Sequence, residues 1–410
     1  MTVQASPAVG SVATPARSRI GLIIALAMIS LYAFAGLYVA RHTEHGLAPG
    51  GAPMFYDFSA FYEAGAFADH GQAARAYDDH AMGHAIAAAF PGTQTRLPWN
   101  YPPTLQMLFM PLAALPYPLA WLIWSAALYG FYACVASRLF AREYLWLALA
   151  LPAAAVNILV GQNGLLTAGL MGGGVLLLDK RPWLAGALFG LLTYKPHFAV
   201  LAPVLLIATR QWRALAGAAV AAAAVALVSL ILFGPAPWLA FVHKALAPSG
   251  VLSSSTSDWR TVPSVQIMAR TLGATPFIAS VLHWSVAALS AGGAVFVWRR
   301  TRDTRLRAAA LGAAALLVTP YLRVYDLAVA ALPLASLASP APGRKPSPAE
   351  NALVIAAWLA PAILLFTASP IQVAPVITVA LMILTVRRAM PGSAQAAPPA
   401  PVLAQARPAP

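Results

Sequence analysis

Long apolar runs separated by short polar stretches dominate this chain. A run of about 20 apolar residues crosses ~30 Å of hydrocarbon as a helix, and the runs lack the apolar–polar alternation of barrel strands. The pattern therefore predicts an all-α polytopic membrane protein. Twelve spans are expected, at residues 18–40, 118–137, 143–159, 163–178, 182–194, 197–209, 214–233, 276–298, 307–320, 324–340, 351–367 and 370–387.

Some of the apolar segments are too short for an ordinary span. Residues 182–194 and 197–209 hold 13 residues each and meet at TYKPH (193–197), whereas a span usually needs at least ~17. Broken helices of this kind are tolerated where protein or water surrounds the exposed backbone. Residues 102–116, bounded by prolines, are predicted to form a re-entrant or surface-lying helix on the outer side.

The basic residues predict how the chain is oriented. They cluster between the apolar runs, and the positive-inside rule places such clusters in the cytoplasm. With the N-terminus inside, every basic cluster follows an even number of spans, so that 18 of the 26 Lys and Arg but only four of the 12 acids lie inside. Membrane orientation thus accounts for the net charge of +14, and we expect no nucleic-acid partner.

The sequence predicts a single transmembrane domain, residues 18–388, with a tail on each side. Residues 1–17 and 389–410 are rich in Ala, Pro and Ser and are predicted to be disordered cytoplasmic tails. The first apolar run exceeds a usual signal-peptide core, which favours an uncleaved anchor. The outer loop 41–103 is expected to hold two short amphipathic helices on the membrane surface, one starting at Phe58 and one with an aspartate cap at its start, where Asp78 and Asp79 lie.

Polar and charged residues gather at the junctions predicted to face outward, whereas the inner junctions are short basic turns. A carboxylate that deprotonates a hydroxyl, together with cations that stabilise a departing phosphate, suits transfer of a group carried on a lipid phosphate. Nucleotide sugars are absent outside the cytoplasm, so a lipid-phosphate sugar is the expected donor. The candidate site residues are Asp57, Tyr62, Glu63, Tyr101, Gln162, Asn163, Lys195, His197, Arg260 and Arg323.

Several of these residues also have a purely structural interpretation. Asp57 is placed to cap the helix that starts at Phe58, and Lys195 to extend along the membrane surface. Arg323 is placed to pair with Asp326 inside the protein. No third ligand accompanies any pair of histidines at metal-binding spacing, and we expect neither a metal nor a cofactor.

Five motifs follow one another along the chain: FYDFSAFYEAG (55–65), ARAYD (74–78), NYPP with PLAALP (100–116), GQNGLL (161–166) and YKPH (194–197). In this order they resemble glycosyltransferase family 87, formerly a domain of unknown function, within the GT-C superfamily. The resemblance implies a GT-C-like bundle and a transferase similar to polyprenyl-phosphate-mannose-dependent mannosyltransferases. It places the general base of an inverting displacement at Asp57, and Lys195 and His197 near the donor phosphate.

The gathering of polar residues at the outward junctions predicts, together with this resemblance, an enzyme of the inner membrane that works on the periplasmic side. Its partners would be membrane lipid, a polyprenyl-phosphate sugar donor and a glycolipid or polysaccharide acceptor. Two other functions stay open at this point. Twelve spans with broken helices are also typical of a transporter or flippase, and outer basic residues suit an O-antigen-ligase-like transferase that moves a whole glycan.

Overall fold

The computed structural model describes residues 15–246, 261–338, 346–366 and 372–390. Within these ranges the regular elements are all helices, and pairing of extended backbone is limited to two isolated bridges near Leu47. Apart from residues 15–17 and 389–390, the tails predicted at the two ends lie outside the described residues.

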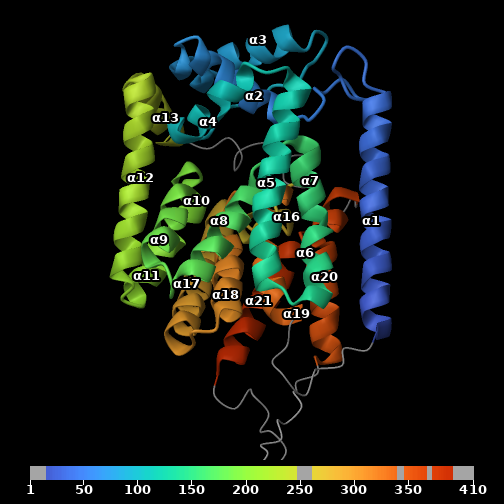
Figure 1. Ribbon diagram of the computed structural model, residues 1–410, viewed down its shortest axis with the longest axis vertical. Coiled ribbons are helices and arrows are strands. Elements are labelled where there is room, and N and C mark those ends of the chain that lie inside the picture. The colour runs from blue at the N-terminus through green and yellow to red at the C-terminus, as the bar shows by residue number, and fades with distance from the viewer. Residues whose placement is uncertain (1–14, 247–260, 339–345, 367–371, 391–410) are drawn as a thin grey trace, which may run out of the picture.

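Four helices are long and apolar enough to cross a membrane (Figure 1). Their large apolar side chains face outward, as Ile231 (73 % exposed) and Leu289 (77 %) illustrate. Such exposure is stable in hydrocarbon and costly in water, so the chain is a membrane protein. The helices are α1 (Pro15–Arg41, apolar from Ile23), α5 (Tyr117–Leu139), α12 (Trp212–Phe233) and α17 (Pro276–Arg300).

A fifth candidate span is broken by a bend of 40°. It consists of η2 (Arg142–Tyr144), α6 (Leu145–Leu149) and α7 (Pro152–Val160). Pro152 lacks the amide hydrogen needed to continue α6, so a new helix begins there. The prediction of twelve spans is therefore not confirmed, because the described structure contains four full-length candidates, or five if this bent pair counts as one.

The other helices of the bundle are shorter. Many of them are enclosed by neighbouring helices, and α8 and α18 are buried along most of their length. They are α8 (Gly164–Leu177), α9 (Pro182–Leu191), η3 (Leu192–Tyr194), α10 (Pro196–Ala199), α11 (Leu201–Ala208), α16 (Val265–Thr271), α18 (Thr304–Val318), η4 (Val324–Ala330), α19 (Ala331–Ala338), α20 (Pro348–Phe366) and α21 (Ala374–Ala389). Small residues allow close contact between them: Gly190 on α9 lies directly against the backbone of Ala218 on α12.

One end of the bundle is covered by short helices, at the top of Figure 1. They are α2 (Phe58–Asp69), η1 (Ala73–Tyr77), α3 (Asp79–Ala89), α4 (Pro103–Ala113) and α13 (Ala236–Leu246). Helices α2 and α3 are the two expected in the loop 41–103, and α4 falls in the segment 102–116. The prediction that Asp78 and Asp79 start the second helix is confirmed: Asp78 is the cap and accepts the amide hydrogens of His80 and Ala81. Asp79 instead pairs with Lys244 on α13.

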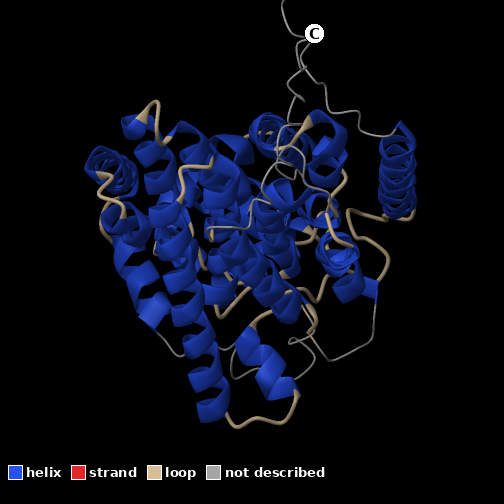
Figure 2. Ribbon diagram, turned by 90° about the horizontal axis from the view of Figure 1, so that it is seen from below, coloured by secondary structure: helices blue, strands red, loops and turns tan. Residues whose placement is uncertain are grey.

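The basic junctions meet at the opposite end. Nε of Arg305 donates to the carbonyl of Leu139 at 2.7 Å, and Nε of Arg299 donates to that of Ala208 at 2.9 Å. Arg307 similarly lies 3.5 Å from the carboxylate of Asp179. Figure 2, seen from this end, shows the helices gathered in one bundle with α1 at its edge. In the described part of the chain, these predicted cytoplasmic junctions thus share one end of the molecule.

Candidate active site

Asp57 stands at the start of α2, at the end covered by the short helices. The preceding turn is held on α5: the Phe55 ring stacks on Trp121 at 3.7 Å between centroids, and the Tyr117 hydroxyl donates to the Met54 carbonyl at 2.7 Å. The Asp57 side chain makes no capping hydrogen bond to α2. Its Oδ2 instead accepts from Nε2 of Gln162 at 3.0 Å. The capping interpretation of this residue is therefore wrong.

Gln162 belongs to the buried turn 161–164, through which α7 passes into α8. Gly161 has φ +71, and a Cβ there would lie 2.5 Å from Cβ of Phe58, so glycine permits both the turn and the contact with α2. Asn157 on α7 holds this turn with two hydrogen bonds. Its backbone carbonyl accepts from the Gln162 N–H at 2.8 Å, and its side-chain oxygen accepts from the Gly164 N–H at 2.6 Å.

The orientation of the Gln162 amide is set by two donors. The Tyr101 hydroxyl at 3.3 Å and the backbone N–H of Asn163 at 3.2 Å both donate to Oε1. Nε2 therefore faces Asp57 as a donor. Tyr101, Gln162 and Asp57 thus form a chain of hydrogen bonds from three segments far apart in the sequence.

A buried ion pair lies on the other side of this turn. Lys195, 3 % exposed, donates from Nζ to Oδ1 of Asp326 at 2.5 Å and to Oδ1 of Asn163 at 2.9 Å. Asp326, 1 % exposed, accepts the backbone N–H of Arg323 at its second oxygen, at 3.0 Å. Lys195 is therefore not a surface lysine, and the predicted Arg323–Asp326 charge pair is wrong, because the cation on Asp326 is Lys195.

Arg323 is the more accessible cation of the site. It is half-buried, and its guanidinium donates to the Thr261 hydroxyl at 2.8 Å. Burial raises the pKa of Asp57, whereas the Gln162 hydrogen bond and the charges of Arg323 and Lys195 act in the opposite direction. The Asp326 carboxylate also raises the pKa of Asp57. The site thus holds a carboxylate with an elevated pKa beside Arg323 and the Lys195–Asp326 pair, which is suited to proton abstraction beside an anionic leaving group.

The remaining candidates lie outside this network or at its edge. His197 follows Lys195 on α10, and its buried Nε2 has no hydrogen-bond partner among the described residues. Tyr62 donates to the Leu115 carbonyl at 2.8 Å. Burial raises the pKa of its neighbour Glu63 to about 7. Arg260 lies outside the described residues.

Two polar residues of the network escaped the sequence analysis as site residues. Asp326 was considered only as a partner of Arg323, and Asn157 was not considered. Both lie within apolar segments, where an acid or an amide is costly without a partner. The cost of burying these two residues could have marked them in the sequence as groups that need partners. In the structure Asp326 pairs with Lys195, and Asn157 also donates to the Tyr325 carbonyl at 2.8 Å.

The fold and this network define a polytopic helical membrane protein with an ionisable site at one end of its bundle. The family model for glycosyltransferase family 87 matches residues 99–320, which is more than half of the chain. The chain belongs to that family and is therefore a glycosyltransferase. No curated protein and no solved structure matches it. The matched range includes Gln162 and Lys195, whereas Asp57 precedes it and Arg323 and Asp326 follow it.

Proposed function

We propose that the protein transfers a hexose, with mannose the favoured sugar, from a polyprenyl-phosphate donor to a hydroxyl group of a lipid or glycan acceptor. The site is proposed to face the periplasm, in a twelve-span GT-C-like inner-membrane protein with both termini cytoplasmic. One observation supports the orientation: the basic junctions share the end of the bundle opposite Asp57. By the positive-inside rule, basic loops are retained in the cytoplasm. The observation that carries the chemistry is the Asp57–Gln162 hydrogen bond of 3.0 Å beside Arg323 and Lys195.

In this proposal Asp57 acts as the general base. It takes the proton of the acceptor hydroxyl while the acceptor oxygen attacks the anomeric carbon from the face opposite the phosphate. The bond between the anomeric carbon and the phosphate oxygen breaks, its electron pair leaves with polyprenyl phosphate, and the configuration inverts. The proton on Asp57 then passes to water. No cofactor takes part, and we expect the rate in excess EDTA to equal the rate without it.

The two cations have different parts in the proposed reaction. Arg323 is the one accessible enough to approach the departing phosphate, where a bidentate guanidinium suits phosphate geometry. Lys195 is already engaged by Asp326 and Asn163 and contributes its charge at longer range. His197 stays a candidate donor to the same phosphate, since its buried Nε2 has no partner in the described part of the chain.

The placement of charge also bears on the alternatives. Transporters place ionisable groups near the membrane midplane, whereas this network lies at one end of the bundle, which favours transfer. Product mass separates a hexosyltransferase from a glycan ligase: one hexose is added in the first case and a long chain in the second.

The experiment compares purified wild type with Asp57→Asn, using polyprenyl-phosphate mannose and membrane lipids of a deletion strain as acceptor. We expect the variant to lose 10²–10⁴-fold in rate, the usual contribution of a general base. Asp69→Asn is the matched control, because Asp69 is an exposed carboxylate at the other end of α2. Wild-type turnover by Asp57→Asn would remove Asp57 from the mechanism.

A further inference from the structure

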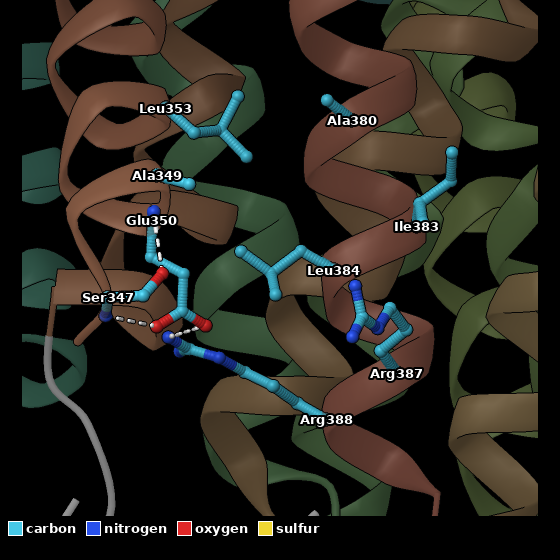
Figure 3. Close-up of a pocket in the computed structure, with 9 residues that line it drawn as sticks. All are labelled: Ser347, Ala349, Glu350, Leu353, Ala380, Ile383, Leu384, Arg387 and Arg388. Carbon is cyan, nitrogen blue, oxygen red and sulfur yellow. Dashed lines mark hydrogen bonds and ion pairs between the residues drawn. The ribbon is translucent and has the colours of Figure 1, made fainter. Parts of the chain in front are cut away.

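A groove of about 560 Å³ opens between α20 and α21, at the end of the bundle opposite Asp57 (Figure 3). Its position follows from Arg388, which donates to the carbonyl of Ser336 at the end of α19, among the basic junctions. The groove is lined at one level by Glu350, Arg387 and Arg388 and at another by Leu353, Ile383 and Leu384. It shares no residue with the Asp57 network.

One charged pair in this groove is structural. Oε1 of Glu350 lies 3.2 Å from the Arg388 guanidinium, and its Oε2 accepts the backbone N–H of Ser347 at 3.0 Å. Glu350 is therefore neutralised. Arg387 is exposed, and Figure 3 shows its guanidinium beside Leu384, apart from that pair. The described lining thus carries one net positive charge, which is located on Arg387.

The apolar part of the groove faces the surroundings of the protein. Leu353 lies one turn beyond Glu350 on α20, and Ile383 lies one turn before Arg387 on α21. The Ile383 side chain is 55 % exposed, as expected of a residue in contact with hydrocarbon. The groove is therefore charged at its water-facing end and aliphatic towards the bilayer, the same division as in a phospholipid.

We propose that this groove binds an anionic phospholipid of the cytoplasmic leaflet, with the phosphate on Arg387 and an acyl chain along Leu353, Ile383 and Leu384. Charge complementarity selects the anionic class, because a zwitterionic headgroup brings no net charge to the cation. Basic pockets between membrane helices on the cytoplasmic side bind anionic headgroups in this way. The site is separate from the proposed sugar-transfer site and does not depend on it.

The test is native mass spectrometry of the purified full chain with added phosphatidylglycerol or phosphatidylcholine. We expect Arg387→Ala to weaken phosphatidylglycerol binding about fivefold, the factor for the ~1 kcal/mol that one arginine contributes near an anionic surface. Phosphatidylcholine binding should not change. Arg387→Lys retains the charge and should retain most of the binding.

Arg138→Ala is the matched control, since Arg138 is an exposed arginine in the last turn of α5, at the same end of the bundle. It should bind phosphatidylglycerol as wild type does. The proposal is overturned if Arg387→Ala retains wild-type affinity for phosphatidylglycerol, if Arg138→Ala loses as much, or if the wild type binds the two lipids equally. None of these outcomes bears on Asp57, because the readout is lipid binding and not sugar transfer.

Discussion

At the scale of single residues, the site depends on how each polar atom is satisfied. Asp57 faces Gln162 rather than the amides of its own helix, and the Gln162 amide is oriented by Tyr101 and the backbone of Asn163. A buried carboxylate with few donors has a raised pKa, and every added donor lowers it.

Gln162→Leu should shift the acid limb of the pH–rate profile to higher pH, because the ionised carboxylate of Asp57 loses a hydrogen-bond donor. The sign follows from the base, which acts when deprotonated: loss of the Gln162 donor raises the pKa of Asp57 further, so a higher pH is needed to ionise it. The profile of kcat against pH measures this. Gln94→Leu, at an exposed glutamine, is the control. An unmoved limb would contradict Asp57 as the titrating base.

Lys195→Met should lower the free energy of unfolding by about 3–5 kcal/mol, because it leaves the Asp326 carboxylate buried without its cation. Lys195→Met combined with Asp326→Leu should recover much of that loss, since an apolar pair needs no charge partner. SDS-induced unfolding measures both variants, with Lys180→Met at an exposed lysine as the control. If the double variant is no more stable than the single one, the ion pair is not what stabilises this junction.

At the scale of elements, the buried turn 161–164 between α7 and α8 packs against two helices that are far from it in the sequence. It contacts α2 at Phe58 and η4 at the Tyr325 carbonyl. Both contacts need glycine, because the backbones approach more closely than a Cβ allows. The geometry of the Asp57 network therefore depends on the packing of α2, α7, α8 and η4 as well as on its own hydrogen bonds.

Gly164→Ala should destabilise the protein by about 1–3 kcal/mol and reduce transfer, because the added methyl group would overlap the Tyr325 carbonyl oxygen. Gly130→Ala is the matched control: this glycine lies within α5 with open space around it, so the change should stabilise the helix by about 0.5–1 kcal/mol. Unfolding and transfer assays on both variants decide the point. Equal effects of the two substitutions would show that Gly164 is not under packing constraint.

At the scale of the whole molecule, the two ends differ in charge and in structure. One end carries the short helices (Figure 1) and the Asp57 network. The other carries the basic junctions and the groove between α20 and α21. This separation places the proposed sugar transfer and the proposed phospholipid site on opposite faces of the membrane.

Cysteine labelling tests that arrangement. In a Cys134→Ser background, an impermeant maleimide should label Gln94→Cys in intact spheroplasts and Arg181→Cys only after permeabilisation. Both positions are exposed, the first in the loop between α3 and α4 and the second next to α9, at the basic end. Labelling of Arg181→Cys in intact spheroplasts would reverse the proposed orientation and remove the periplasmic site.

The sequence predicted those features that depend on a local pattern of residues. Apolar runs predicted a helical membrane protein, amphipathic spacing predicted α2 and α3, and proline boundaries predicted the short helix α4. It was less informative about partners. Trp99, for example, is 1 % exposed and packs edge-on against Phe61, a contact that no local pattern indicates. The number of full-length spans was not confirmed either, because helices enclosed by protein are shorter than the hydrocarbon thickness requires.

The sequence by itself determined that this is a helical membrane protein and that its polar residues gather at one end of the bundle. Hydropathy and charge set these properties through the membrane, whichever residues pack next to one another. The tertiary structure alone decided which polar groups meet. Lys195 and Asp326 are 131 positions apart, and Asp57 and Gln162 are 105 apart. A buried charge or amide needs some partner, but which one it finds depends on which helices pack together, and that is a property of the assembled bundle.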